Sequence, residues 1–287
     1  MRRLSAKNWI WIGLPIGLLM AITLPPFIYA VRLSLLNFDI SKPYQKTVFV
    51  GFGNYVEVLL NTRSLNAFRN TGVLVGLSVS VEIIIGIGIA LLIDRFSSLR
   101  TLLYTLVLVP LLLPRIVVAL LWKIMYHPTL GIINYIVSLF KLPVITWLAN
   151  PKLALYSIAI VDIWQWTPFV AIIIGSALEV LPKDPIEAAQ IEGANRTQTF
   201  WYILLPMLKP VLVVAAIFRT LMALRTFDLV WIMTGGGPGI STETVDIYAY
   251  LIGLSRGGRI SYASATAIIM LGLTIGIFTF FLRIAKE

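Results

Sequence analysis

The stretch "EAAQIEGANRTQTFWYILLP", from Glu187 to Pro206, is a polar interruption between two long apolar segments of the chain. Pro182 and Pro185 end the apolar segment before it, and acidic residues then stand where the N-terminus of a helix is electropositive. Gly193 permits a sharp change of backbone direction. The sequence therefore predicts two short helices that meet at a bend, the second of them over residues 195–201.

The charges of this stretch indicate what it contacts. A helix that lies on a lipid surface is expected to carry Lys and Arg on its polar face. Here three acids stand against two bases, and small apolar side chains lie among them. The acids are Asp184, Glu187 and Glu192, the bases are Lys183 and Arg196, and the apolar residues are Ile186, Ala188 and Ala189. We therefore interpret the stretch as a docking surface for another protein.

The segments on either side assign the chain to the membrane. Of its 287 residues 59% are hydrophobic and 13% charged, and the mean hydropathy is +0.90, whereas about 25% of the residues of a soluble domain are charged. Six mostly apolar segments are long enough to cross a bilayer as helices. They are Trp9–Val31, Asn70–Ile93, Leu102–Met125, Leu153–Leu181, Tyr202–Leu224 and Tyr262–Ile284. The predicted fold class is an all-α membrane protein with six transmembrane helices, because the ten-residue alternating segments of a β-barrel are absent.

Basic residues near the ends of the chain predict its orientation. Arg2, Arg3 and Lys7 precede the first apolar segment, which favours a cytoplasmic N-terminus. Six spans return the C-terminus, with Arg283 and Lys286, to the same side. This arrangement, with both termini inside, puts the polar stretch in the cytoplasm. It also explains the net charge of +10, so we expect no nucleic-acid partner.

The remaining segments predict the organisation of the chain. Residues 1–69 are expected to hold a retained N-terminal helix and the first external segment. Residues 70–287 are expected to form a five-helix core, with the cytoplasmic loop at 182–201. A second external segment contains a possible short interfacial helix over Ile132–Phe140, and a third covers 225–261. The absence of cysteine excludes disulfides and thiolate sites.

Ionisable side chains inside the spans are costly and are expected to face a cavity or a partner. They are Glu82, Arg115, Lys123, Asp162, Lys209 and Arg219. Lys123 and Lys209 lie near span ends, from which a long side chain extends to the membrane surface. Glu82, Arg115 and Asp162 fit two roles equally well, structural ion pairs between helices or groups on a solute pathway.

Two spans carry the best candidates for a solute site. On the fourth span, Gln165, Trp166 and Phe169 share a helical face, and a similar spacing on the fifth gives Arg219, Met222, Ala223 and Thr226. Aromatic rings stack on the C–H face of a sugar, while amide and guanidinium groups donate hydrogen bonds to its hydroxyls. Two alternatives stay open. The tryptophans are packing or interface residues, or Arg219 binds an anionic group such as that of glycerol phosphate.

No segment of the sequence predicts catalysis. The three glycines at 235–237 lack the following Lys-Ser/Thr of a phosphate-binding loop, and Pro238 would break the helix that such a loop needs. Carboxylate pairs, metal-binding clusters and nucleophile–base arrangements are also absent from the sequence. We therefore expect a chain that is not an enzyme and holds no cofactor, so that any ATP and Mg²⁺ would be bound by partner subunits.

The polar stretch resembles a known motif. Glu187-Ala188-Ala189, three residues, Gly193, nine residues and then Ile203-x-Leu205-Pro206 is similar to the EAA loop of permease subunits of bacterial and archaeal ABC importers. "FDLVWIMTGGGPGIST" from Phe227 and "GFGNYVEVLL" from Gly51 resemble the sugar-permease, MalF/UgpA-like branch. The resemblance covers nearly the whole chain and implies the MetI-like fold of type I importer permeases.

The resemblance also implies a function and partners. The loop would be the coupling helix seated on an ATPase, with these residues at or near the contact: Glu187, Ala188, Ala189, Gly193, Ala194, Ile203, Leu205 and Pro206. The expected partners in a prokaryotic cell membrane are a second, MalG-like permease, two cytoplasmic ATPases, an extracytoplasmic solute-binding protein docked near 32–69 and 225–261, and a sugar or oligosaccharide. An ion-driven carrier is the less favoured alternative, since the paired inverted repeats of such carriers are not found.

Overall fold

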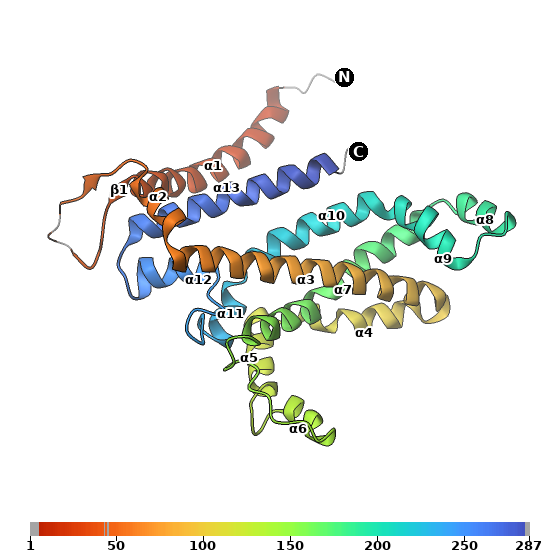
Figure 1. Ribbon diagram of the computed structural model, residues 1–287. Coiled ribbons are helices and arrows are strands. Elements are labelled where there is room, and N and C mark those ends of the chain that lie inside the picture. Colours follow the sequence, from red (N-terminus) through yellow and green to blue (C-terminus); the bar gives the residue numbers. More distant parts are fainter. Residues whose placement is uncertain (1–5, 43, 45, 285–287) are drawn as a thin grey trace. The chain divides into compact units, whose positions relative to one another are not determined.

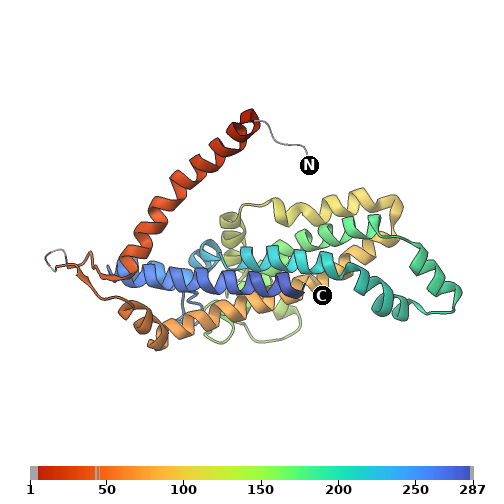
Figure 2. The ribbon, with the colours of Figure 1, turned by 90° about the horizontal axis from the view of Figure 1, so that it is seen from above.

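The structure, a computed structural model, describes residues 6–42, 44 and 46–284 and is dominated by helices (Figures 1 and 2). Arg2, Arg3 and Lys286, which support the predicted orientation, lie outside the described residues. The longer helices are α1 (Ala6–Ser34), α3 (Thr62–Arg95), α4 (Arg100–Leu112), α5 (Arg115–Met125), α7 (Ala154–Val180), α10 (Leu205–Ala223) and α13 (Ile260–Ile284). The shorter helices are α2 (Gly53–Leu60), α6 (Ile132–Leu139), α8 (Asp184–Ile191), α9 (Arg196–Thr199), α11 (Phe227–Met233) and α12 (Val245–Tyr250). Strands β1 (Leu36–Asn37) and β2 (Val48–Phe49) pair antiparallel.

Five of the described helices are long and apolar enough to cross a membrane, and a sixth span is possible only as a bent pair. The predicted span over Leu102–Met125 corresponds to this bent pair, in which α4 and α5 meet at 89°. Pro114 has no N–H to donate, and a residue before proline avoids the helical region. Leu113 is accordingly extended, with ψ 134°, and α4 ends before it.

The second span begins earlier than the hydropathy predicts. Helix α3 starts at Thr62 rather than at Asn70. The Oδ1 atom of Asn61 accepts hydrogen bonds from the backbone N–H groups of Arg63 (2.9 Å) and Ser64 (3.2 Å). An asparagine side chain that satisfies the first free amides of a helix sets where it starts, so this boundary depends on capping rather than on hydrophobicity.

The predicted external segments contain more helix than expected. The short helix predicted over Ile132–Phe140 is present as α6. The third predicted external segment, 225–261, contains α11, α12 and a π-helical turn over Leu251–Ser255. Helix α11 has only seven residues, which is too short for a hydrophobic period to identify it, whereas α12 continues into the π-helical turn.

The chain forms two compact units. One comprises residues up to 65 together with 248–271. In this unit the Tyr248 and Tyr262 hydroxyls lie 2.8 Å apart, and Arg259 forms a two-pronged ion pair with Glu57. The hydrogen bonds from Arg259 hold the pKa of Glu57 below its usual value. Both partners of this pair remain about two-fifths exposed.

The other unit comprises residues 66–247 with 272 onward, and its core lies where α3, α7 and α10 meet. Ala90, Val170, Ile174 and Leu208 are fully buried there. Gly86 brings the backbone of α3 close to α7, since a Cβ atom at this position would stand 2.7 Å from Val170 Cγ1. Small residues permit such approaches between helices in a membrane. In Figures 1 and 2 these helices run side by side, with α8 and α9 at one end and α5 and α11 at the other.

Candidate functional site

The turn between α8 and α9, predicted as two short helices meeting at a bend, has a defined backbone geometry. Gly193 has a φ of +87°, in the left-handed region that glycine tolerates. The N–H of Ala194 donates to the Ala189 carbonyl (2.9 Å), and the N–H of Gly193 donates to that of Gln190 (3.1 Å). This pair of bonds is the Schellman motif that ends many helices. The bend is therefore specified by Gly193.

Helix α9 begins with a capping box. Asn195 Oδ1 accepts from the Gln198 N–H (2.9 Å), while Gln198 Oε1 accepts from the Asn195 N–H (2.8 Å). The sequence reading missed this pair, although the Asn-x-x-Gln spacing signals it. A π-helical turn over Phe200–Leu204 then joins α9 to α10, so the helix that becomes the fifth span runs from Arg196 to Ala223 and starts earlier than the predicted Tyr202.

The two faces of α8 differ from the prediction. Ala189 is buried and Ile186 is half-buried, so these residues face the protein rather than a partner. Glu187 and Ala188 are exposed, and Ile191 is 87% exposed. Glu187, Ala188 and Ile191 follow helical spacing, so they form one exposed stripe, which we call the α8 stripe, with Glu187 at the edge that borders the bundle. The sequence pattern did not indicate Ile191, although it stands three residues beyond Ala188.

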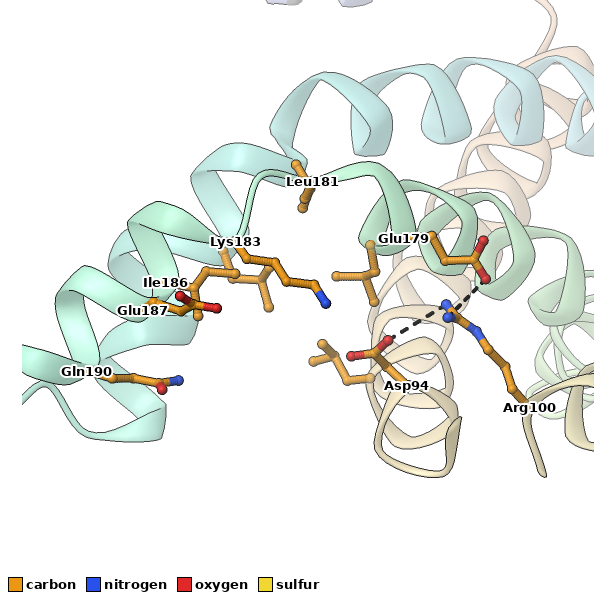
Figure 3. Close-up of a pocket in the computed structure, with 11 residues that line it drawn as sticks. Asp94, Arg100, Glu179, Leu181, Lys183, Ile186, Glu187 and Gln190 are labelled. Carbon is orange, nitrogen blue, oxygen red and sulfur yellow. Dashed lines mark ion pairs between the residues drawn. The ribbon is translucent and has the colours of Figure 1, made fainter. Parts of the chain in front are cut away.

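Two hollows flank the turn. The larger, about 590 Å³, lies between α8 and the ends of α3, α4 and α7 (Figure 3), and Lys183, Glu187 and Gln190 line it with Asp94, Arg100 and Glu179. The smaller, about 380 Å³, is lined by Ala189, Glu192, Gly193, Ala194, Gln198, Tyr202 and Ile203. Of the remaining predicted coupling residues, Leu205 is half-buried and Pro206 exposed in the first turn of α10.

A second cluster lies deep in the same unit and contains the costly charges. Arg219 Nε and Nη2 donate to the carboxylate of Glu82, and Nη2 also reaches Asp162 Oδ2 (2.7 Å). Arg115 Nη2 donates to Asp162 Oδ1 (2.6 Å). Glu82, Asp162 and Arg219 are fully buried. We call these four residues the buried ion network, which ties together α3, α5, α7 and α10.

Two of the predicted solute residues lie beside this network. The Trp166 ring lies under the Arg219 guanidinium, whose Cζ is 5.0 Å from the ring centroid, and the Phe169 ring stands edge-on to Trp166 at 6.0 Å. Among the described residues, Trp166 Nε1 and Arg219 Nη1 are buried and have no hydrogen-bond partner. Aromatic faces and free donors are therefore brought together here.

The other predicted solute residues are placed differently. Gln165 Nε2 donates to the Leu113 carbonyl (3.1 Å), a backbone group that the α4–α5 break frees. Met222 is half-buried and Ala223 is buried at the end of α10. Thr226 is buried but lies beyond that helix, at the start of α11, so helical spacing does not align it with Arg219.

The two lysines predicted near span ends both have exposed side chains. Lys209 is exposed on α10. Lys123 is also exposed, and its Nζ donates to the Ile232 carbonyl at 2.7 Å. This bond joins α5 to α11. Lys123 therefore contributes to packing as well as extending its charge outward.

Comparison with known proteins gives the family. Residues 82–286 match the family described as binding-protein-dependent transport system inner membrane component. The trehalose/maltose transport system permease protein MalF of Thermococcus litoralis is 36% identical, across 83% of this chain and 80% of that protein. The sulfoquinovosyl glycerol transport system permease protein SmoG of Agrobacterium fabrum is 33% identical, across 83% and 77%.

A crystal structure of a bacterial alginate ABC transporter shares the fold. Its matched chain has a TM-score of 0.81 with 23% identity, across 98% of this chain and 95% of that chain. The predicted importer-permease fold is thereby confirmed. The matched relatives are permeases, the transport components of such importers rather than their enzymes. The chain therefore belongs to the binding-protein-dependent transport system inner membrane components, as a sugar-type ABC importer permease that crosses the plasma membrane of a prokaryote several times.

Proposed function

We propose that this permease, paired with a second, MalG-like permease, conducts a neutral sugar or oligosaccharide, and that ATPase subunits drive it through the α8–α9 turn. Membership of the family implies ATPases and an extracytoplasmic binding protein as partners. The proposed orientation has both termini in the cytoplasm, with α8 and α9 at the cytoplasmic end. The family match over 82–286 supports a permease core within 70–287, and we assign 1–69 to the N-terminal helix and the first external segment.

The α8 stripe is the observation that carries the coupling proposal. It exposes an apolar side chain, Ile191, next to the carboxylate of Glu187. Burying one such apolar side chain against a partner contributes about 1.5–3 kcal/mol. The Schellman motif and the capping box hold the corner from both sides of Gly193. Because the backbone is fixed on both sides of Gly193, we expect a movement of α8 to move α9 and α10 with it rather than to bend the turn.

Changing Ile191 tests this surface. We expect Ile191→Asp to weaken co-purification of the ATPase and to lower uptake, because it puts a charge at the centre of an apolar contact. Thr197→Asp is the matched control, since Thr197 is exposed on α9 outside the α8 stripe. Unchanged co-purification and unchanged uptake in Ile191→Asp would refute the coupling surface.

The charge balance of the buried ion network supports a neutral solute. Arg219 is matched by Glu82 and Asp162, and Asp162 is shared with Arg115, so the four residues carry two positive and two negative charges. An anion would have to compete with these carboxylates for Arg219. This argues against glycerol phosphate as the solute. The proposed path retains Gln165, Trp166, Phe169, Arg219, Met222, Ala223 and Thr226, with Trp166 and Phe169 as the stacking surface.

Uptake by the assembled transporter in lipid vesicles tests the solute class. We expect a neutral disaccharide to be taken up and its phosphorylated form to be excluded. Aromatic contacts contribute about 0.5–1.5 kcal/mol each, so Trp166→Ala should raise the KM of uptake by up to about tenfold. Trp164→Ala, two residues away and partly exposed, should leave the KM nearly unchanged. Equal effects of the two changes would contradict the stacking role.

A further inference from the structure

Helix α4 is held to α7 at its first residue by an arginine. Arg100 Nη1 lies 2.9 Å from Glu179 Oε1, and its Nη2 donates to the Gly175 carbonyl at 3.3 Å. The same Nη2 lies 3.7 Å from Asp94 Oδ1, near the end of α3. Figure 3 shows Arg100 between these two carboxylates, across the hollow from α8. One side chain thus joins the ends of three helices.

A second arginine, just beyond the other end of α4, holds the start of α5 to the same helix. Arg115 follows the α4–α5 break and pairs with Asp162 of α7 at 2.6 Å. Asp162 and Glu179 are separated by about 25 Å along α7, at 1.5 Å per residue. Between them Tyr104 packs directly on Gly175, where a Cβ atom would stand 1.7 Å from the Tyr104 hydroxyl. Helix α4 is therefore joined to α7 at its first residue and packs closely on it, and the start of α5, just beyond the last residue of α4, is joined to α7 as well.

The position of the contact between Arg100 and the carboxylates of Glu179 and Asp94 gives it a mechanical role. Glu179 is the second-last residue of α7, five residues before α8 begins at Asp184. Asp94 is likewise the second-last residue of α3. An isolated exposed ion pair is weak, but Arg100 is only 23% exposed and combines two carboxylates with a carbonyl. It lies where a displacement of α8 would first enter the bundle.

We propose that α4 and α7 move as one body, and that Arg100 is the positioning residue that carries a displacement of α8 into α4 and, through Arg115, to Asp162. This inference rests on the proposed function, in which α8 receives the ATPase. Neutralising Arg100 should then leave a permease that assembles with its partners but transmits the nucleotide cycle poorly.

The first test uses the whole transporter in lipid nanodiscs and vesicles. We expect Arg100→Gln to keep basal ATP hydrolysis but to reduce its stimulation by the loaded binding protein at least about fivefold, the lower end of coupling between distant sites. Uptake per ATP should fall in parallel, and Arg100→Lys should retain part of both. Arg95→Gln removes an equal charge from an exposed residue at the same end of the bundle. Its stimulated ATP hydrolysis and its uptake per ATP should stay within about twofold of the wild-type values.

The second test replaces the ion pair by a covalent bridge. The chain contains no cysteine, so Arg100→Cys with Glu179→Cys provides two unique thiols for a short bismaleimide. Bridging the two cysteines should restore stimulation and uptake, because it holds α4 to α7 without the charges. The bismaleimide should not restore stimulation or uptake in the single variant Arg100→Cys, which has only one thiol. A bridge that blocks uptake would show that the two helices must separate, and would overturn the inference.

The outcomes separate this inference from the proposed function. Normal coupling in Arg100→Gln beside impaired coupling in Ile191→Asp would refute the role of Arg100 and leave the coupling surface intact. Normal coupling in Ile191→Asp would refute both. If Arg100→Gln fails to insert, Glu179→Gln removes the more exposed partner of the same pair and gives the same comparison.

Discussion

Gly193 shows how one residue specifies the corner that this permease is proposed to present to its ATPase. Its φ of +87° is unfavourable for residues with a Cβ atom, yet the space around it is open, since nothing lies within 4 Å of a Cβ built there. The requirement for glycine is therefore conformational rather than steric. The cost of the left-handed conformation for other residues is about 1–2 kcal/mol.

Replacing Gly193 separates these two causes. Gly193→Val should distort the corner and lower stimulated ATP hydrolysis, because a β-branched residue is least tolerant of positive φ. Gly193→Asn should retain most of the activity, because asparagine adopts this region more readily. The measurement is stimulated hydrolysis by the assembled transporter, with membrane insertion as the control. Similar losses in both variants would indicate a steric contact with the ATPase instead.

The buried ion network makes a second prediction at the residue scale. Glu82→Gln removes one carboxylate from Arg219, and breaking a buried pair on one side typically costs about 3–5 kcal/mol. We expect a marked loss of thermal stability in nanodiscs. Glu57→Gln, which breaks the half-exposed pair with Arg259, should cost at most about 1 kcal/mol. Equal stability of the two variants would mean that the network is not structural.

At the scale of the helices, close packing depends on where small residues stand. Gly86 and Gly88 both lie on α3, but only Gly86 faces α7. A Cβ at 86 would stand 3.2 Å from the backbone nitrogen of Ala171 as well as against Val170, whereas one at 88 meets nothing within 4 Å.

This pair gives a matched test of the α3–α7 contact. Gly86→Ala should lower the melting temperature, because α3 and α7 must separate to admit the methyl group. Gly88→Ala should be neutral or slightly stabilising, because alanine favours helix. Thermal unfolding in nanodiscs measures both. A greater loss in Gly88→Ala would contradict the packing.

At the scale of the whole molecule, the permease is expected to depend on its partners. Reconstituted alone, it should neither hydrolyse ATP nor move a sugar into vesicles, since the energy is proposed to enter through the α8–α9 turn. Adding the second permease, the ATPases and the binding protein should restore uptake. Transport driven by a proton or sodium gradient in the chain alone would favour an ion-driven carrier and would refute the proposal.

The sequence predicted the helices best where hydrophobicity alone decides them. Most predicted spans correspond to long helices, and the polar turn at Gly193 has the expected bend. The early start of α3 was not predicted, because the side chain of Asn61 sets it. The 89° break after Leu113 was not predicted either. A proline within a span indicates that the helix bends, but the packing of the neighbouring helices sets the angle.

What the sequence by itself determined is the class of the molecule, the approximate spans, the place of the polar turn and which ionisable residues lie inside the spans. These follow from the composition of contiguous residues. Only the tertiary structure decided which charges pair, because Arg219 lies 137 residues from Glu82 and 57 from Asp162. It also decided that Ile191 faces outward while Ala189 is buried, and that Arg100 joins α4 to α7. Such pairings depend on how helices distant in the sequence pack, and hydropathy carries no information about that.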